Sequence, residues 1–88
     1  MKTLIVYGQD LDNCVLCRQY EPVVQMLIEE GYEVERIDAF TPEGIANPRN
    51  LEYQVMGTPT TIILNDGEYE TQFVGARPLS FMHKLLEN

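Results

Sequence analysis

The chain has few positive charges and no long apolar run. Six Lys and Arg stand against fourteen Asp and Glu, which gives a formal net charge of −8 at pH 7. This excess of negative charge repels nucleic-acid phosphates and anionic lipid surfaces, so we expect neither as a partner. The longest uncharged apolar stretches, residues 4–7 and 60–64, are far shorter than the roughly 20 residues that span a bilayer. We therefore expect no membrane segment.

Cysteine is also scarce, since two cysteines are too few for the disulfide framework of a small secreted protein. The first residues are typical of a strand and not of a signal peptide, so we expect a cytoplasmic protein. With 44% hydrophobic and 23% charged residues, the chain has the composition of a globular protein. Its 88 residues predict one small domain, residues 1–88. We expect this domain to be a monomer. A chain this short has no room for a large substrate-enclosing cavity.

Four strands are predicted from the apolar pattern. Residues 3–7 form a continuous apolar run, which is typical of a strand buried on both faces of a sheet. In residues 32–38 the apolar alternation breaks in the middle, which favours an outer position. Residues 60–64 and 68–74 flank Asn65-Asp66-Gly67, and this turn sequence predicts a hairpin.

Three helices complete the pattern. Apolar residues recur at helical spacing up to Gly31, so we expect one helix there, bent at Pro22. The residues of this stripe are Leu16, Tyr20, Val23, Val24, Leu27 and Ile28. Thr41 and Asn47 each precede a proline, as helix-capping residues do, and we favour a single helix from Asn47 to about Val55. Residues 78–86 predict the last helix.

The order βαβαββα predicts an α/β fold. The first strand, the first helix and the second strand form a right-handed parallel crossover. The hairpin then adds two antiparallel strands on the other side of the first strand. We therefore expect a four-stranded mixed sheet in the order 2-1-3-4, flanked by helices.

Cys14 and Cys17 lie three residues apart where the first helix begins. The free N–H groups and the dipole of a helix N-terminus stabilise a thiolate and lower its pKa. Cys17 lies one turn later, close enough to attack a mixed disulfide formed at Cys14. Arg18 would favour the Cys14 thiolate, whereas Asp10 and Asp12 would oppose it. This pattern predicts redox exchange in which Cys14 attacks and Cys17 resolves.

Other uses of a Cys-x-x-Cys pair fit the chain less well. A zinc site normally has four ligands, and here only the distant His83 could join the two cysteines within one chain. A c-type haem site needs His directly after the second cysteine, where Arg18 stands. A purely structural disulfide over so short a loop removes little chain entropy. We expect no metal, but a structural or dimer-bound metal role stays open.

Several segments together resemble the thioredoxin superfamily over nearly the whole chain. The resemblance rests on Cys14-Val15-Leu16-Cys17 after a buried strand, Pro22 five residues later, Thr58-Pro59-Thr60 opening the third strand, and Gly75 closing the fourth. It implies a thioredoxin-like fold and a cis Thr58–Pro59 peptide bond beside the cysteines. It also implies that Thr58, Pro59 and Gly75 bind substrate, with the Thr58 backbone pairing with an extended segment of the partner.

Departures from the family pattern indicate a subtype. The chain has no Trp, and its first strand has no Asp to take the proton of Cys17. Val15 and Gly75-Ala76-Arg77-Pro78 are similar to glutaredoxin-like redoxins that donate electrons to ribonucleotide reductase, and the opening segment is similar to phage glutaredoxins. This resemblance implies that thioredoxin reductase, more than glutathione, supplies the electrons.

The sequence thus predicts a thiol–disulfide oxidoreductase that reduces protein disulfides through Cys14 and Cys17. Its only redox group would be the Cys14–Cys17 disulfide, with no bound cofactor. The rival hypothesis is a thioredoxin-fold binding module whose cysteines are structural or bind a metal.

Overall fold

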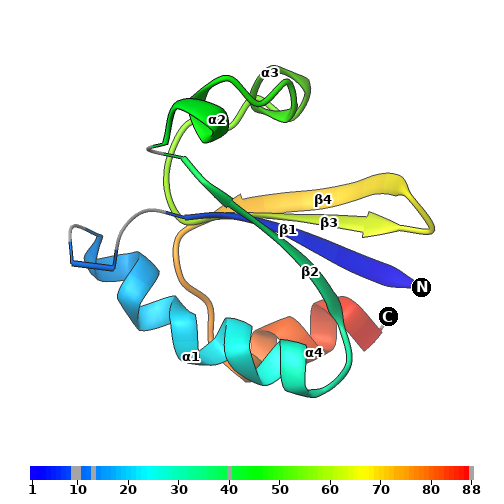
Figure 1. The fold of residues 1–88 in the computed structure, drawn as a ribbon. Helices are drawn as coiled ribbons and strands as arrows, with labels where there is room; N and C mark the ends of the chain where they lie inside the picture. Colours follow the sequence, from blue (N-terminus) through cyan, green and yellow to red (C-terminus); the bar gives the residue numbers. More distant parts are fainter. Residues whose placement is uncertain (9–10, 13, 40, 88) are drawn as a thin grey trace.

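The structure, a computed structural model, describes residues 1–8, 11–12, 14–39 and 41–87. A central sheet separates two helical layers: α1 and α4 cover one face, and α2 and α3 cover the other (Figure 1). The elements are β1 (Lys2–Gly8), α1 (Val15–Glu29), β2 (Glu33–Asp38), α2 (Pro42–Ile45), α3 (Arg49–Glu52), β3 (Thr60–Asn65), β4 (Glu68–Val74) and α4 (Leu79–Glu87). No helix among these residues is both long and apolar enough to cross a lipid bilayer.

The sheet has the predicted order β2-β1-β3-β4. β1 runs parallel to β2 and antiparallel to β3, and β3 pairs antiparallel with β4. In this register Tyr7 lies opposite Ile37 on one side and Thr60 on the other. The last residues of β1 and the first residues of β3 therefore lie side by side, at the same end of the two strands. This arrangement brings the segment after β1, with its cysteines, close to the segment before β3.

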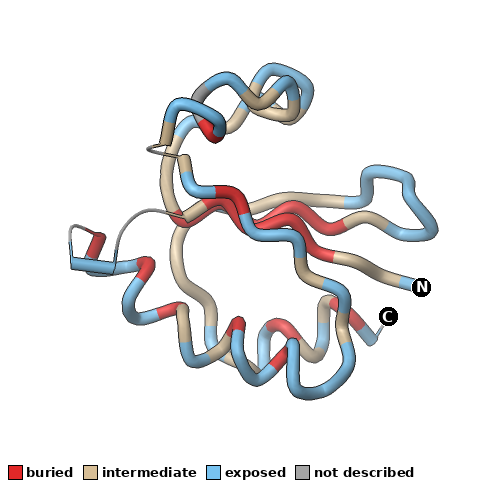
Figure 2. The backbone as a smooth tube through the Cα atoms, in the orientation of Figure 1, coloured by how far each residue is buried: buried red, intermediate tan, exposed pale blue. Residues whose placement is uncertain are grey.

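β1 is buried on both faces, as its apolar run predicts. Leu4 and Val6 pack against α1 and α4, while Ile5 and Tyr7 pack on the opposite face with Ile62. Figure 2 shows the buried residues gathered in the central strands and along the inner sides of α1 and α4. Burying each such side chain stabilises the folded state by about 1.5–3 kcal/mol. β1 therefore provides a rigid support for α1, which carries the two cysteines.

The buried face of α1 differs from the predicted stripe at its two ends. The structure buries Cys17, Tyr20, Val24 and Leu27, whereas Leu16 and Ile28 are exposed. Cys17 takes the inward position because it lies three residues before Tyr20, at helical spacing. Pro22 lies inside α1 without ending it.

Gly31 closes α1, as predicted, two residues after the last helical residue, Glu29. Gly31 has a φ of +96°, and its N–H donates to the Ile28 carbonyl at 3.0 Å. The Tyr32 N–H donates to the Leu27 carbonyl at 3.1 Å. This pair of bonds is a Schellman motif, which glycine favours because it adopts a positive φ without strain.

The single helix predicted from Asn47 to Val55 is wrong, because the structure has two helices of four residues each. The first, α2, begins after Thr41, whose hydroxyl accepts a hydrogen bond from the Gly44 N–H at 3.0 Å. The second, α3, is preceded by Asn47, whose side-chain oxygen accepts from the Arg49 N–H at 3.0 Å. Thr41 is thus the N-cap of α2 as predicted, whereas the N-cap of α3 is Pro48, one residue after Asn47. The order becomes βαβααββα.

Candidate functional site

Cys14 is the N-cap residue of α1. Its Sγ accepts a hydrogen bond from the Cys17 backbone N–H at 3.1 Å, and its carbonyl accepts from the Arg18 N–H at 3.0 Å. The sulfur thus takes the position of a capping side-chain oxygen. Since this position lies at the positive end of the helix dipole, it favours a thiolate over a thiol.

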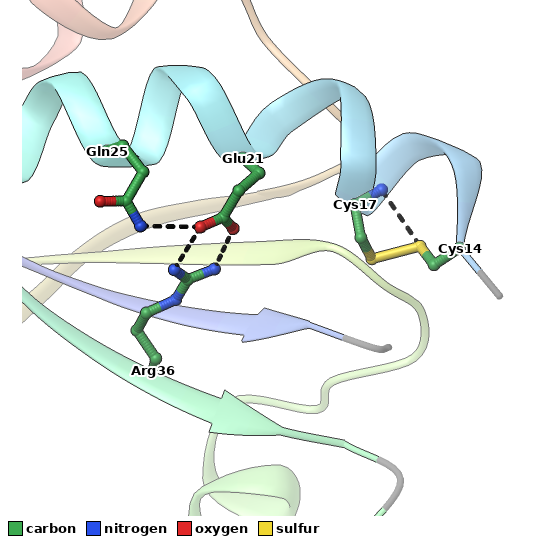
Figure 3. A network of polar contacts seen from close by, with 5 residues as sticks. All are labelled: Cys14, Cys17, Glu21, Gln25 and Arg36. Carbon is green, nitrogen blue, oxygen red and sulfur yellow. Dashed lines mark hydrogen bonds and ion pairs between the residues drawn. A yellow bond between two sulfur atoms is a disulfide. The ribbon is translucent and has the colours of Figure 1, made fainter. Parts of the chain in front are cut away.

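Cys14 and Cys17 form a disulfide, with their Cα atoms 5.2 Å apart. Figure 3 shows the disulfide at the start of α1, with Glu21 further along the same helix. The two cysteines are only 8% and 5% exposed, whereas Val15 and Leu16 between them are 58% and 46% exposed. The apolar side chains of Val15 and Leu16 therefore form the exposed surface beside the two buried sulfurs.

The segment before β3 completes the site. The Thr58–Pro59 peptide bond is cis, and the Thr58 hydroxyl oxygen lies 3.9 Å from Cys14 Sγ. Gly75, at the end of β4 with a φ of +100°, donates its N–H to the Pro59 carbonyl at 2.8 Å. Cys14, Thr58, Pro59 and Gly75 come from three segments that lie far apart in the sequence, and the structure brings them together.

Three charged residues were predicted to tune the pKa of Cys14: Arg18, Asp10 and Asp12. Arg18 is exposed, and none of the described contacts joins its guanidinium to either sulfur. Asp12 is exposed, and Asp10 lies outside the described residues. The effect of Arg18 on the pKa of Cys14 therefore stays a prediction.

Buried hydrogen bonds of Tyr20 link α1 to β3 and α4. Thr61 donates its hydroxyl to the Tyr20 oxygen at 2.9 Å, and Tyr20 donates to Met82 Sδ of α4 at 3.5 Å. Burial raises the pKa of Tyr20 above its usual value, so the phenol stays protonated at neutral pH. This link could not be predicted from the sequence, because Tyr20 fits the apolar stripe of α1.

A polar network joins α1 to the outer strand β2. Glu21 receives two hydrogen bonds from Arg36 and a third from Gln25 at 2.8 Å (Figure 3). The Arg36 hydrogen bonds hold the pKa of Glu21 below its usual value. A carboxylate held ionised in this way is a poor proton acceptor, so we assign Glu21 a structural role in holding α1 against β2.

Replacing Glu21 with Gln should lower the free energy of unfolding at pH 7 by about 0.5–1 kcal/mol, because the pair is partly exposed and solvent screens it. Since folding lowers the pKa of Glu21, its contribution is present above the unfolded pKa and declines as the pH falls below about 4.3. Urea denaturation of both proteins at pH 7 and pH 3 measures the difference.

Glu29→Gln is the matched control, because Glu29 is an exposed residue of the same helix with no ion pair among the described residues. We expect this control to change the unfolding free energy by less than about 0.5 kcal/mol. An equal loss in the two variants, or a Glu21→Gln effect that persists at pH 3, would contradict the assignment.

Metal binding is the alternative role for the two cysteines. In the part of the chain that the structure describes, no three His, Cys, Asp or Glu side chains are grouped so that they could hold a metal ion. His83 instead contacts Glu30, with 2.8 Å between its Nε2 and a carboxylate oxygen.

Comparison with solved structures finds thioredoxins. A mutant thioredoxin from Halobacterium salinarum NRC-1 superposes with a TM-score of 0.80 over 98% of this chain and 72% of that chain, at 29% sequence identity. Thioredoxin O2 from Arabidopsis thaliana, solved in the oxidised state, gives a TM-score of 0.77 over 99% and 73%, at 18% identity. No protein-family model and no curated protein sequence matches the chain.

The two structures differ in what they support for this chain. The second structure supports the fold alone, whereas the first adds sequence identity over nearly the whole chain. The glutaredoxin-like subtype inferred from Val15 and residues 75–78 stays a prediction, since both named structures are thioredoxins. The chain belongs to the thioredoxin-like superfamily.

Proposed function

We propose that the protein is a thiol–disulfide oxidoreductase that reduces protein disulfides by cycling between the Cys14–Cys17 disulfide and the dithiol. One observation carries this proposal: the Cys14 sulfur caps α1 and lies beside the Thr58–Pro59 segment. The first feature favours a nucleophilic thiolate, and the second supplies a strand-like backbone on which a substrate can dock. No bound cofactor is needed, because the two cysteines carry both electrons.

The first step is attack by the Cys14 thiolate on one sulfur of the partner's disulfide. A new S–S bond forms between Cys14 and the partner, the partner's own S–S bond breaks, and its second sulfur leaves as a thiolate that takes a proton from water. Cys14 is suited to this role because the Cys17 N–H points at its sulfur, 3.1 Å away.

In the second step Cys17 loses its proton and attacks the Cys14 sulfur of the mixed disulfide. The Cys14–Cys17 bond forms, the bond to the partner breaks, and the partner's remaining sulfur leaves as a thiolate. The partner gains two electrons, and the protein ends in its disulfide form. Because Val6, Leu4 and their neighbours on β1 carry no carboxylate, water is the expected proton acceptor for Cys17.

Substrate binding is assigned to the backbone around Pro59. An extended segment of the partner would pair with the main chain of Thr58 and pass Gly75, where no side chain stands in its way. Val15, Leu16, Met56 and Val74 are exposed apolar residues of the same segments. They would cover the apolar residues that flank the partner's disulfide.

The finer assignments rest on the subtype resemblance. Thioredoxin reductase, more than glutathione, is the proposed electron source, and ribonucleotide reductase is one proposed disulfide substrate. The protein would act as a cytoplasmic monomer, in a phage-infected host if the source is a phage.

Turnover assays with insulin disulfides test the proposal. The protein should accelerate insulin reduction with NADPH and thioredoxin reductase, and more slowly with NADPH, glutathione and glutathione reductase. A faster glutathione-coupled rate would overturn the ranking of reductants. No acceleration with either system or with dithiothreitol would overturn the proposed function. Zinc that stays bound to the purified protein at a fixed ratio would instead favour the metal-binding module.

A further inference from the structure

Tyr7 is buried, but its hydroxyl has no hydrogen-bond partner among the residues that the structure describes. The side chain lies near the end of β1 and is 0% exposed. Leaving such a donor unbonded costs free energy, and most buried hydroxyls in proteins are therefore paired. Burial raises the pKa of Tyr7 above its usual value, so the phenol stays protonated at neutral pH. The hydroxyl is thus available to an acceptor from outside the chain.

Tyr7 lines a cavity of about 270 Å³ beside the Thr58–Pro59 segment. The other described residues that line it are Ala39, Asn50, Val55, Met56, Gly57 and Thr58. The cavity is larger than one water, which takes about 30 Å³, but smaller than the roughly 300–1,000 Å³ of pockets that hold whole small molecules. It therefore has the size of a side chain. Thr58 joins it to the site, because the Thr58 hydroxyl oxygen lies 3.9 Å from Cys14 Sγ.

The surroundings of the Tyr7 hydroxyl favour an uncharged acceptor. Tyr7 itself is the one ionisable residue among the described residues that line the cavity. The nearby cation Arg49 forms an ion pair with Glu35, and Glu52 adds a further negative charge. A carboxylate would therefore enter a negative field, in a chain whose formal net charge is −8. A carboxamide instead presents a neutral oxygen that accepts a hydrogen bond from a phenol.

We propose that this cavity is a specificity pocket for an asparagine or glutamine side chain of the partner protein, whose carboxamide oxygen accepts a hydrogen bond from the Tyr7 hydroxyl. The side chain belongs to the extended segment that pairs with the main chain of Thr58, because Thr58 borders the cavity as well. The inference rests on the proposed function for the source of this segment. It adds a preference for disulfides that have a carboxamide residue close to them in the partner's sequence.

Two small probes test the pocket without any redox step. N-acetyl-glutamine methylamide and N-acetyl-leucine methylamide share one backbone, but only the first has a side-chain acceptor. Each is titrated into the isotope-labelled disulfide form, and NMR shifts of the Asn50, Val55 and Gly57 amides give its dissociation constant. The glutamine probe should bind about three- to tenfold more tightly, the size expected for one hydrogen bond. Equal binding of the two probes would overturn the inference.

Tyr7→Phe removes only the hydroxyl. This variant should lose the preference for the glutamine probe and unfold at a higher urea concentration, because an unpaired buried donor is gone. Tyr32→Phe is the matched control and should keep the preference, since Tyr32 packs on the opposite face of the sheet. A preference that persists in Tyr7→Phe would overturn the inference. So would a lower urea midpoint, because the hydroxyl would then be bonded within the folded protein or to water.

Turnover separates this inference from the proposed function. Two disulfide peptides that differ only in glutamine or leucine beside one cysteine compete for the same protein. Faster reduction of the glutamine peptide, lost in Tyr7→Phe, would support both claims. Equal reduction of the two peptides would keep the proposed function and overturn the pocket's role in specificity. Binding of the glutamine probe without reduction of either peptide would overturn the proposed function and keep the cavity as a carboxamide site.

Discussion

Replacing Cys14 with Ser should lower the rate of insulin reduction by roughly a thousandfold or more, because it removes the attacking sulfur. Cys17 cannot take over, since it lies within the helix and not at the N-cap. Replacing Cys17 with Ser should also stop turnover, but for another reason. Cys14 can still attack in that variant, and the mixed disulfide then accumulates because no second thiolate releases the partner.

Mass spectrometry under non-reducing conditions separates the two variants. Cys17→Ser should carry a covalently bound partner after incubation with a disulfide substrate, and the partner should leave on addition of dithiothreitol. Cys14→Ser should carry none. Adducts that form equally in both variants would contradict the assignment of Cys14 as nucleophile and Cys17 as resolving residue.

The second large effect is expected at Gly44, where α2 lies on the end of β2. A Cβ atom added there would overlap the Asp38 carbonyl oxygen and lie 2.7 Å from the Asp38 carbonyl carbon. Backbone atoms cannot move aside as the tip of a flexible side chain can. Gly44→Ala should therefore lower the free energy of unfolding by about 3 kcal/mol or more, measured from urea denaturation midpoints.

Gly8→Ala is the matched control, because no atom lies within 4 Å of a Cβ added there. It should change the unfolding free energy by less than about 0.5 kcal/mol. The Gly44 carbonyl also accepts a hydrogen bond from the Asn50 side chain at 2.8 Å, which links α2 to α3. If Gly44→Ala were as stable as Gly8→Ala, the close packing of α2 on β2 would be wrong.

Most of the sheet could be predicted because its signals are local. The continuous apolar run of β1 reflects burial on both faces, and Asn65-Asp66-Gly67 marks the hairpin by its turn chemistry. The outer position of β2 follows from its broken alternation. These features need no knowledge of tertiary contacts, and the strand order then follows from the handedness of the crossover.

The region between β2 and β3 could not be predicted in the same way. A helix of four residues has just over one turn, so it leaves no apolar periodicity to detect. What decides its position is the close approach of Gly44 to the Asp38 carbonyl, and this is a tertiary contact. Thr41-Pro42 and Asn47-Pro48 were both visible in the sequence as candidate helix starts, but nothing local indicated that a helix begins at each of them.

The candidate site was only partly visible in the sequence. The polar loop before Cys14 and the apolar stripe after it predict that Cys14 and Cys17 lie at the start of α1, and the structure confirms this. The predicted stripe of α1 was wrong at its two ends, where Leu16 and Ile28 are exposed. It also left out Cys17, which was counted for its chemistry and not as an apolar core residue. The Thr58 hydroxyl could not be found, because its distance from Cys14 depends on how the segment before β3 meets the end of β1.

The reduction potential of the Cys14–Cys17 couple tests the central claim most directly. The protein is equilibrated in thiol buffers of defined potential, and free thiols are counted by the mass added on alkylation. The proposed function predicts a reversible two-electron couple between about −180 and −270 mV, the range of thioredoxins, glutaredoxins and disulfide isomerases. A potential below about −300 mV would instead identify a structural disulfide and contradict the account.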